Sequence, residues 1–84
     1  MRSRVVLYVR NGCGLCDEAA ALLDRSIGPE GYRKTDVGVS DELLVRYAHR
    51  IPVVAVDGIE RYEAPITAPD VDELAASLRA APNG

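Results

Sequence analysis

The sequence predicts one α/β domain spanning residues 1–84, in which a four-stranded mixed sheet is flanked by helices in the order β-α-β-α-β-β-α. Two observations point most directly to this class. The apolar run Val5–Val9 is followed by apolar residues at helical spacing, and Asp57-Gly58 joins two short strand-like runs later in the chain. A chain of 84 residues can bury one compact core but not two.

The first half of the chain has the pattern of a strand-helix-strand unit. The run Val5–Val9 is β-branched and aromatic throughout, which favours a central strand covered on both faces. A helix is predicted over 14–27, and Gly28-Pro29 ends it. Its apolar positions are Leu15, Ala19, Leu22, Leu23 and Ile27. A second strand is predicted over Tyr32–Val37, parallel to the first because the unit is so short.

A short second helix is predicted after Ser40, whose hydroxyl can cap it. The helix has to end before Pro52, because the residue that precedes a proline avoids helical angles. Its narrow apolar face holds Leu43, Leu44 and Tyr47. We expect His49 and Arg50 near the end of this helix, close to solvent.

The last part of the chain predicts a hairpin and a helix. Strands over Val53–Val56 and Ile59–Glu63 flank Asp57-Gly58, which suits the positive φ angles of a two-residue turn, so the strands pair antiparallel. Thr67 and Asp70 have the spacing of a capping box. The final helix then packs on the sheet through Val71, Leu74, Ala75 and Leu78.

Composition argues against several classes of partner. The net charge is −3, and nine of the ten basic residues are Arg and scattered singly, which gives no cationic surface for nucleic acid or anionic lipid. No segment approaches the roughly 18 apolar residues that span a bilayer. The start Met1–Val9 is basic and then apolar, but the apolar run is too short for a signal peptide. We therefore expect a cytoplasmic protein, monomeric and without a membrane or nucleic-acid partner.

The two cysteines, Cys13 and Cys16, admit three interpretations. A zinc site usually needs four Cys or His ligands, and beyond this pair the chain offers only His49, so a metal site needs a carboxylate or a second subunit. A stabilising disulfide would close a longer loop, since closing about four residues removes only about 2 kcal/mol of unfolded-chain entropy. A redox pair accounts for the spacing directly.

Their position at a helix start predicts different roles for the two thiols. Free N–H groups at this end favour a thiolate and depress its pKa into a span of roughly 3.5 to 7.5. Cys13, before the first turn, is the expected nucleophile, and Cys16, inside the helix, is the shielded resolving thiol. Asp17 and Glu18 oppose a nearby thiolate and are expected to have at most a moderating effect.

Two segments, VLYVRNGCGLCDEA and IPVVAVDG, together with the order of elements, resemble a small bacterial glutaredoxin-like group of the thioredoxin fold. The resemblance covers nearly the whole chain. It implies a thioredoxin-like fold and a dithiol-disulfide oxidoreductase that transfers electrons through a redox-active disulfide, with no bound prosthetic group. It also implies that the peptide bond before Pro52 is cis and faces Cys13.

The resemblance also suggests which residues bind substrate. Arg10 stands where glutaredoxins usually carry a lysine that contacts a glutathione carboxylate, and Gly14-Leu15 replaces their usual Pro-Tyr. Pro52 cannot donate a hydrogen bond, so the backbone groups of Ile51 are expected to be free for a substrate backbone. The predicted substrate-binding residues are Arg10, Gly14, Leu15, Ile51 and Pro52.

One departure from glutaredoxins bears on the substrate. Many have a Gly-Gly pair after the last strand, where their backbone meets glutathione, but this chain has Glu63-Ala64-Pro65-Ile66-Thr67. A protein disulfide and a glutathione mixed disulfide both remain open as substrates, with glutathione or a thioredoxin reductase as electron donor. Two other functions remain open as well: a zinc or iron-sulfur protein that uses the same cysteines, and an adaptor that holds a partner peptide at Ile51-Pro52.

Overall fold

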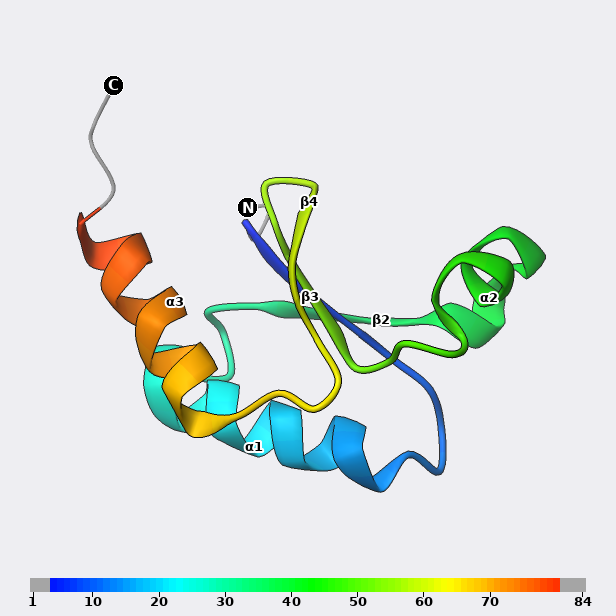
Figure 1. Cartoon of the computed structure of the whole chain (residues 1–84), viewed down its shortest axis with the longest axis horizontal. Coiled ribbons are helices and arrows are strands. Elements are labelled where there is room, and N and C mark those ends of the chain that lie inside the picture. Colours follow the sequence, from blue (N-terminus) through cyan, green and yellow to red (C-terminus); the bar gives the residue numbers. More distant parts are fainter. Residues whose placement is uncertain (1–3, 81–84) are drawn as a thin grey trace.

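The computed structural model describes residues 4–80, which form a four-stranded sheet and three α-helices (Figure 1). The first half contains β1 (Val5–Val9), α1 (Gly14–Ile27) and β2 (Arg33–Asp36). A single 3-10 turn, η1 (Val37–Val39), leads into α2 (Asp41–Tyr47). The second half contains β3 (Val53–Val56), β4 (Ile59–Glu63) and α3 (Ala68–Ala80). This is the predicted order of elements, and the fold is the expected α/β fold of the thioredoxin type.

The strands lie in the order β2-β1-β3-β4, so β1 is central, as predicted. It pairs parallel with β2 and antiparallel with β3, which in turn pairs antiparallel with β4. The turn between β3 and β4 has positive φ angles at Asp57 (53°) and Gly58 (82°), in agreement with the prediction from this dipeptide. The sheet is therefore mixed, with the β1–β2 crossover made by α1.

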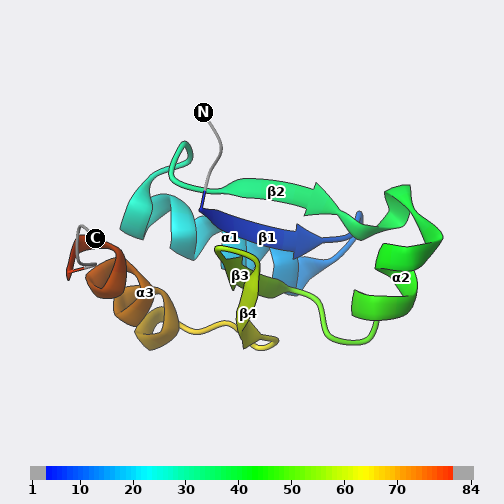
Figure 2. The same ribbon diagram turned by 90° about the horizontal axis from the view of Figure 1, so that it is seen from above.

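The main core lies between the sheet and the two long helices. Helices α1 and α3 contact one another, and α2 lies at the other end of the molecule from α3 (Figures 1 and 2). The buried residues of this core come mainly from β1, α1, β3 and α3 and include Val5, Leu7, Leu23, Val54, Val71 and Leu74. A smaller core of Val37, Tyr47 and Val53 lies under α2. The final helix packs as predicted, through Val71, Leu74 and Ala75.

The prediction that β1 is covered on both faces is only half right. Val5 and Leu7 are buried under α1 and α3, but Val6 and Tyr8, which alternate with them, are only half-buried. The reason is the length of α2. With seven residues, Asp41–Tyr47, it covers only one end of the second face.

The second strand is shorter than predicted at both ends. Tyr32 is buried, and its hydroxyl donates to Asp24 Oδ1 at 2.8 Å, so it packs against α1 instead of extending β2. At the other end, the carboxylate of Asp36 accepts from the Gly38 N–H at 2.8 Å. Such an aspartate turn satisfies the backbone locally and competes with continued strand pairing. The strand therefore ends at Asp36.

Two helix starts form as the sequence predicts. Ser40 caps α2, its Oγ accepting from the Leu43 N–H at 3.1 Å. At the start of α3, Thr67 donates its N–H to Asp70 Oδ2 at 2.9 Å, and the Asp70 N–H donates back to Thr67 Oγ1 at 3.3 Å. This reciprocal pair is a capping box. Within residues 4–80, every helix is too short or too polar to cross a bilayer.

Candidate active site

The site begins where β1 ends and α1 starts. After Val9 the chain turns at Gly12, whose φ of 77° is costly for residues with a Cβ, and reaches Cys13 in an extended conformation. Cys13 is the N-cap of α1, and its Sγ accepts a hydrogen bond from the Cys16 N–H at 3.1 Å. The sulfur therefore occupies the place that a serine or aspartate oxygen takes in most helix caps.

Cys13 and Cys16 are joined by a disulfide, with Cα atoms 5.2 Å apart. Cys13 is partly exposed, whereas only 3% of the Cys16 surface is exposed. An incoming substrate can therefore reach Cys13 more easily than Cys16. This is the order of exposure that the positions of the two residues in the helix predict.

The predicted apolar face of α1 is wrong at one position. Leu15 is 49% exposed, although the sequence groups it with the core residues. The buried stripe instead runs through Cys16, Ala19, Ala20 and Leu23, the i, i+3, i+4, i+7 spacing of one helix face. Leu15 lies one residue off this stripe, in the first turn, so an apolar side chain stands exposed beside the disulfide. Gly14, Asp17 and Glu18 are exposed as well.

The segment around Pro52 lies at the end of the sheet where β1 ends and the chain leads to Cys13. The antiparallel register pairs Tyr8 with Val53, so the residues that follow β1 and those that precede β3 leave the sheet from one end. The Ile51–Pro52 peptide bond is cis, and Pro52 is buried. The prediction that both backbone groups of Ile51 are free is wrong, because its N–H donates to the Tyr47 carbonyl at 3.1 Å. Of the two groups, only its carbonyl is left as a candidate for substrate.

Arg50, expected near solvent, is held in place by contacts on several sides. Its guanidinium donates to Glu60 Oε1 at 2.6 Å and to the Arg46 carbonyl at 3.0 Å, and it lies 5.3 Å from the centre of the Tyr47 ring. The carbonyl of Arg50 accepts from the Ala64 N–H at 3.3 Å. Hydrogen bonding to Arg50 lowers the pKa of Glu60. Arg50 thus ties α2 to β4 directly before the Ile51–Pro52 segment, whereas His49 is exposed as predicted.

A small cavity of about 180 Å³ adjoins the buried cysteine. Its charged lining residues come from three segments: Arg10 after β1, Asp17 in α1 and Lys34 in β2. The remaining lining residues are Val9, Asn11, Gly12 and Cys16. The structure therefore brings Arg10 to the same cavity as Cys16. The sequence does not predict Lys34 as a site residue. It lines the same cavity as Cys16 because β2 pairs with β1, and a local sequence pattern does not show which strands pair.

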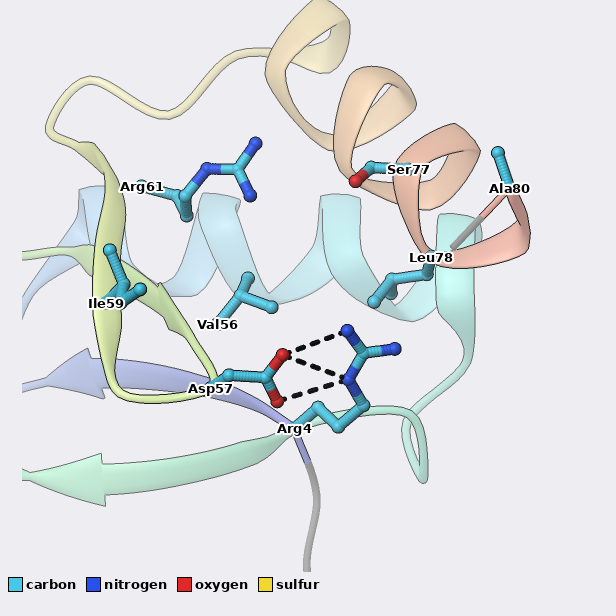
Figure 3. A pocket seen from close by; sticks show the side chains of 8 residues that line it. All are labelled: Arg4, Val56, Asp57, Ile59, Arg61, Ser77, Leu78 and Ala80. Carbon is cyan, nitrogen blue, oxygen red and sulfur yellow. Dashed lines mark hydrogen bonds and ion pairs between the residues drawn. The ribbon is translucent and has the colours of Figure 1, made fainter. Parts of the chain in front are cut away.

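A larger cavity, of about 420 Å³, has none of the predicted site residues in its lining (Figure 3). It lies between the β3–β4 hairpin and α3, and Val56, Ile59 and Leu78 form part of its wall. The guanidinium of Arg4 is paired with the carboxylate of Asp57 there, with Nη2 and Oδ2 2.9 Å apart. This pair raises the pKa of Arg4 and lowers that of Asp57, chiefly through their hydrogen bonds.

In the connection between β4 and α3, most backbone N–H groups already have hydrogen-bond partners or are absent. The Ala64 N–H donates to Arg50 and the Thr67 N–H to Asp70, while Pro65 has no N–H to offer. The Ala64–Pro65 peptide bond is cis. This segment replaces the Gly-Gly pair of many glutaredoxins and offers few free donors to a ligand.

Residues 4–80 contain no group of three or more His, Cys, Asp or Glu side chains placed to hold a metal ion. Besides the two cysteines, the predicted site residues are Arg10, Gly14, Leu15, Ile51 and Pro52. The structure brings Arg10 to a cavity shared with Cys16, places Gly14 and Leu15 in the first turn of α1, and leaves Ile51 and Pro52 at the same sheet edge. The cysteine pair at disulfide distance fits a thiol redox role.

Comparison with known proteins supports the fold and the family. One solved structure, the X-ray structure of the structural-genomics target protein XcR50 from X. campestris, is 30% identical to this chain, with a TM-score of 0.66. The match covers 93% of this chain and 99% of the other. No curated protein matches. The family model described as "Glutaredoxin-like domain (DUF836)" matches residues 4–79, nearly the entire chain, and on this match the protein belongs to the glutaredoxin-like domain family.

Proposed function

We propose that this protein is a dithiol-disulfide oxidoreductase that uses Cys13 and Cys16 to reduce disulfides. The observation that carries the proposal is the 3.1 Å hydrogen bond from the Cys16 N–H to Cys13 Sγ at the start of α1. An N–H directed at a sulfur favours the thiolate over the thiol, and the positive end of a helix acts in the same direction. Cys13 is thus the more exposed and the better activated thiol of the pair.

The reaction follows from this difference between the two thiols. In the first step the Cys13 thiolate attacks a sulfur of the substrate disulfide, a new S–S bond forms, and the other substrate sulfur leaves and takes up a proton. In the second step the Cys16 thiolate attacks Cys13 Sγ, and the second substrate sulfur leaves. The dithiol loses two electrons and becomes the Cys13–Cys16 disulfide, and the substrate disulfide gains them. A thiol donor then restores the dithiol.

Several features of the site favour a protein disulfide as the substrate over a glutathione mixed disulfide. Leu15 gives an exposed apolar side chain beside Cys13, and the Ile51 carbonyl can accept from a substrate backbone. The β4–α3 connection has the Ala64 and Thr67 N–H groups already engaged. Glutathione remains a candidate electron donor, and the guanidinium of Arg10 can pair with one of its carboxylates. We place the reaction in the cytoplasm, where such thiols are kept reduced.

The proposal is tested with two substrates and two donors. A small mixed disulfide and a protein disulfide are each offered with glutathione or with thioredoxin reductase, and thiol release is followed. We expect turnover with at least one pairing, complete loss in Cys13→Ser, and a trapped mixed disulfide, detected by mass spectrometry, in Cys16→Ser.

Two results would overturn this function. If neither donor restores the dithiol, the protein has no catalytic cycle. If protein purified without chelator holds stoichiometric metal per dimer, the two sulfurs serve as ligands instead.

A further inference from the structure

The second step of the proposed reaction requires the Cys16 thiol to lose its proton. Only 3% of Cys16 is exposed, and its N–H is already engaged with Cys13. Burial of a thiol in apolar surroundings disfavours the thiolate, because the charge loses its hydration. Ionisation of Cys16 therefore has to be favoured by groups around its side chain.

The cavity beside Cys16 provides suitable surroundings. Its volume of about 180 Å³ is room for several water molecules, and polar groups in its lining can hold them. The charged residues that line it with Cys16 are Arg10, Asp17 and Lys34, two cations and one anion. Water there can accept the Cys16 proton, and the net positive lining favours the negative sulfur that remains.

The register of the sheet explains how Lys34 comes to this cavity. Lys34 pairs with Leu7 in the parallel β1–β2 ladder, and Leu7 is buried on the side of the sheet that α1 covers. Paired residues project to the same face of a sheet and neighbours alternate. Lys34 therefore projects on the α1 side, whereas Arg33, which pairs with Val6, projects on the other.

We propose that Lys34, aided by Arg10, favours the thiolate of Cys16 across this cavity, and so sets the rate of the resolving step. This role rests on the proposed function, because it acts on the second thiol of that reaction. The proton passes from Cys16 Sγ to water in the cavity. The new Cys16–Cys13 bond forms as the bond between Cys13 and the substrate breaks, and the released substrate sulfur takes up a proton. Lys34 thus acts through Cys16, while Asp17 opposes it.

The test separates the two steps with a chromogenic reagent. Reduced protein is mixed rapidly with dithiobis(nitrobenzoate), which releases one coloured thiol when Cys13 attacks it and a second when Cys16 attacks Cys13. The second phase is intramolecular, so its rate does not change with reagent concentration. Both phases are recorded as a function of pH for the unmodified protein and for Lys34→Met.

In Lys34→Met we expect the pH midpoint of the second phase to rise by about half a unit or more, and its rate at neutral pH to fall about threefold. Asp17→Asn moves the midpoint in the opposite direction. High salt shrinks the difference, since Lys34 is exposed and its charge is screened. The matched control is Arg33→Met, which removes a cation from the adjacent position on the opposite face and leaves the second phase unchanged.

The outcomes distinguish this inference from the function on which it rests. A second-phase midpoint that is the same in Lys34→Met and the unmodified protein overturns the role of Lys34 and leaves the dithiol reaction intact. An equal shift in Arg33→Met overturns it too, because the effect is then one of general charge. If the unmodified protein lacks the concentration-independent phase, Cys16 does not resolve Cys13, and the dithiol reaction fails.

Discussion

The amide nitrogen of Cys16 lies 3.1 Å from the Sγ of Cys13 and donates a hydrogen bond to it. The contact caps α1, and it also places an N–H donor on the sulfur expected to react first. The same three-residue separation allows the two sulfurs to join in a disulfide. One local feature of the backbone thus connects the start of a helix to the chemistry proposed for the pair.

The activation of Cys13 can be measured directly. In the reduced Cys16→Ser variant, alkylation of Cys13 by iodoacetamide should have a pH midpoint below about 8.5, the value of an ordinary thiol, because the helix end favours the thiolate. Mass spectrometry gives the extent of reaction. The control is Cys13→Ser, in which the buried Cys16 should react slowly. A midpoint at or above about 8.5 in Cys16→Ser contradicts activation by the helix end.

Leu15 should affect substrate binding more than folding. It is 49% exposed, so Leu15→Ala is expected to change the free energy of unfolding by no more than about 0.5 kcal/mol, measured by urea denaturation. The same change should raise KM for a protein disulfide and leave kcat nearly unchanged, because apolar contact with the substrate is lost. The matched control is Val45→Ala, at an 85% exposed position on α2. An unaltered KM in Leu15→Ala argues against docking at this residue.

Tyr32 should make the fold sensitive to alkali. Burial, together with the hydrogen bond to Asp24, raises the pKa of Tyr32 to about 12. Below its ordinary pKa of about 10 the phenol is neutral in the folded and the unfolded chain, so its contribution to stability is fully present. As the pH rises from about 10 towards 12, the unfolded chain ionises first and the contribution is lost.

Tyr32→Phe tests this contribution. At neutral pH the variant should lose about 1 kcal/mol of unfolding free energy, because the hydrogen bond to Asp24 Oδ1 at 2.8 Å is gone. Between pH 9 and about 11, urea unfolding of the oxidised variant should show a shallower loss of stability than the unmodified protein. Equal slopes would show that Tyr32 ionises as easily in the folded chain as in the unfolded one.

The ion pair of Arg50 and Glu60 should make the stability of the fold depend on pH in the acidic range. The hydrogen bond from Arg50 lowers the pKa of Glu60 below its ordinary value of 4.5. The contribution of the pair is present above that ordinary value and is lost as the pH falls through the lower folded pKa. Arg50→Met should therefore lower the urea midpoint at pH 7, and the difference from the unmodified protein should shrink in acid.

His49→Ala is the matched control for Arg50→Met, since it removes the exposed neighbour of Arg50 in the chain. We expect this control to unfold at nearly the same urea concentration as the unmodified protein. A difference for Arg50→Met that stays constant from pH 7 to pH 3 would mean that its packing on Tyr47, and not its pairing with Glu60, supports the fold.

The predictions that succeed depend on contacts between residues close in sequence. The Asp57-Gly58 turn, the Thr67–Asp70 capping box and Cys13 at a helix start each follow from spacings of three residues or fewer. Such patterns state their geometry directly, because backbone angles and capping bonds depend on neighbours in the chain. The site residues that the resemblance predicts were likewise identified by their positions within or next to the Cys13–Cys16 and Ile51-Pro52 motifs.

Among the site predictions, the free Ile51 N–H and the buried Leu15 are wrong, and the sequence also misses contacts that packing creates. The contact of Arg50 with Glu60 spans ten residues and joins the end of α2 to β4. The Ile51 N–H is engaged by Tyr47 across the turn that ends α2, and Lys34 reaches the Cys16 cavity only because β2 pairs with β1. Leu15 has the correct period for a helix, but Cys16 and Ala20 occupy the buried stripe instead.

The sequence by itself determined the order of the elements, the central place of β1 and the capping position of Cys13, because periodicity and capping are local properties of the chain. Only the tertiary structure decided which charges surround Cys16. Those charges come from three segments, and their approach depends on strand pairing and on the packing of α1. The effect of a charge depends on its distance through space, whereas the sequence shows only which residues are neighbours along the chain. It therefore could not show which charges lie near Cys16.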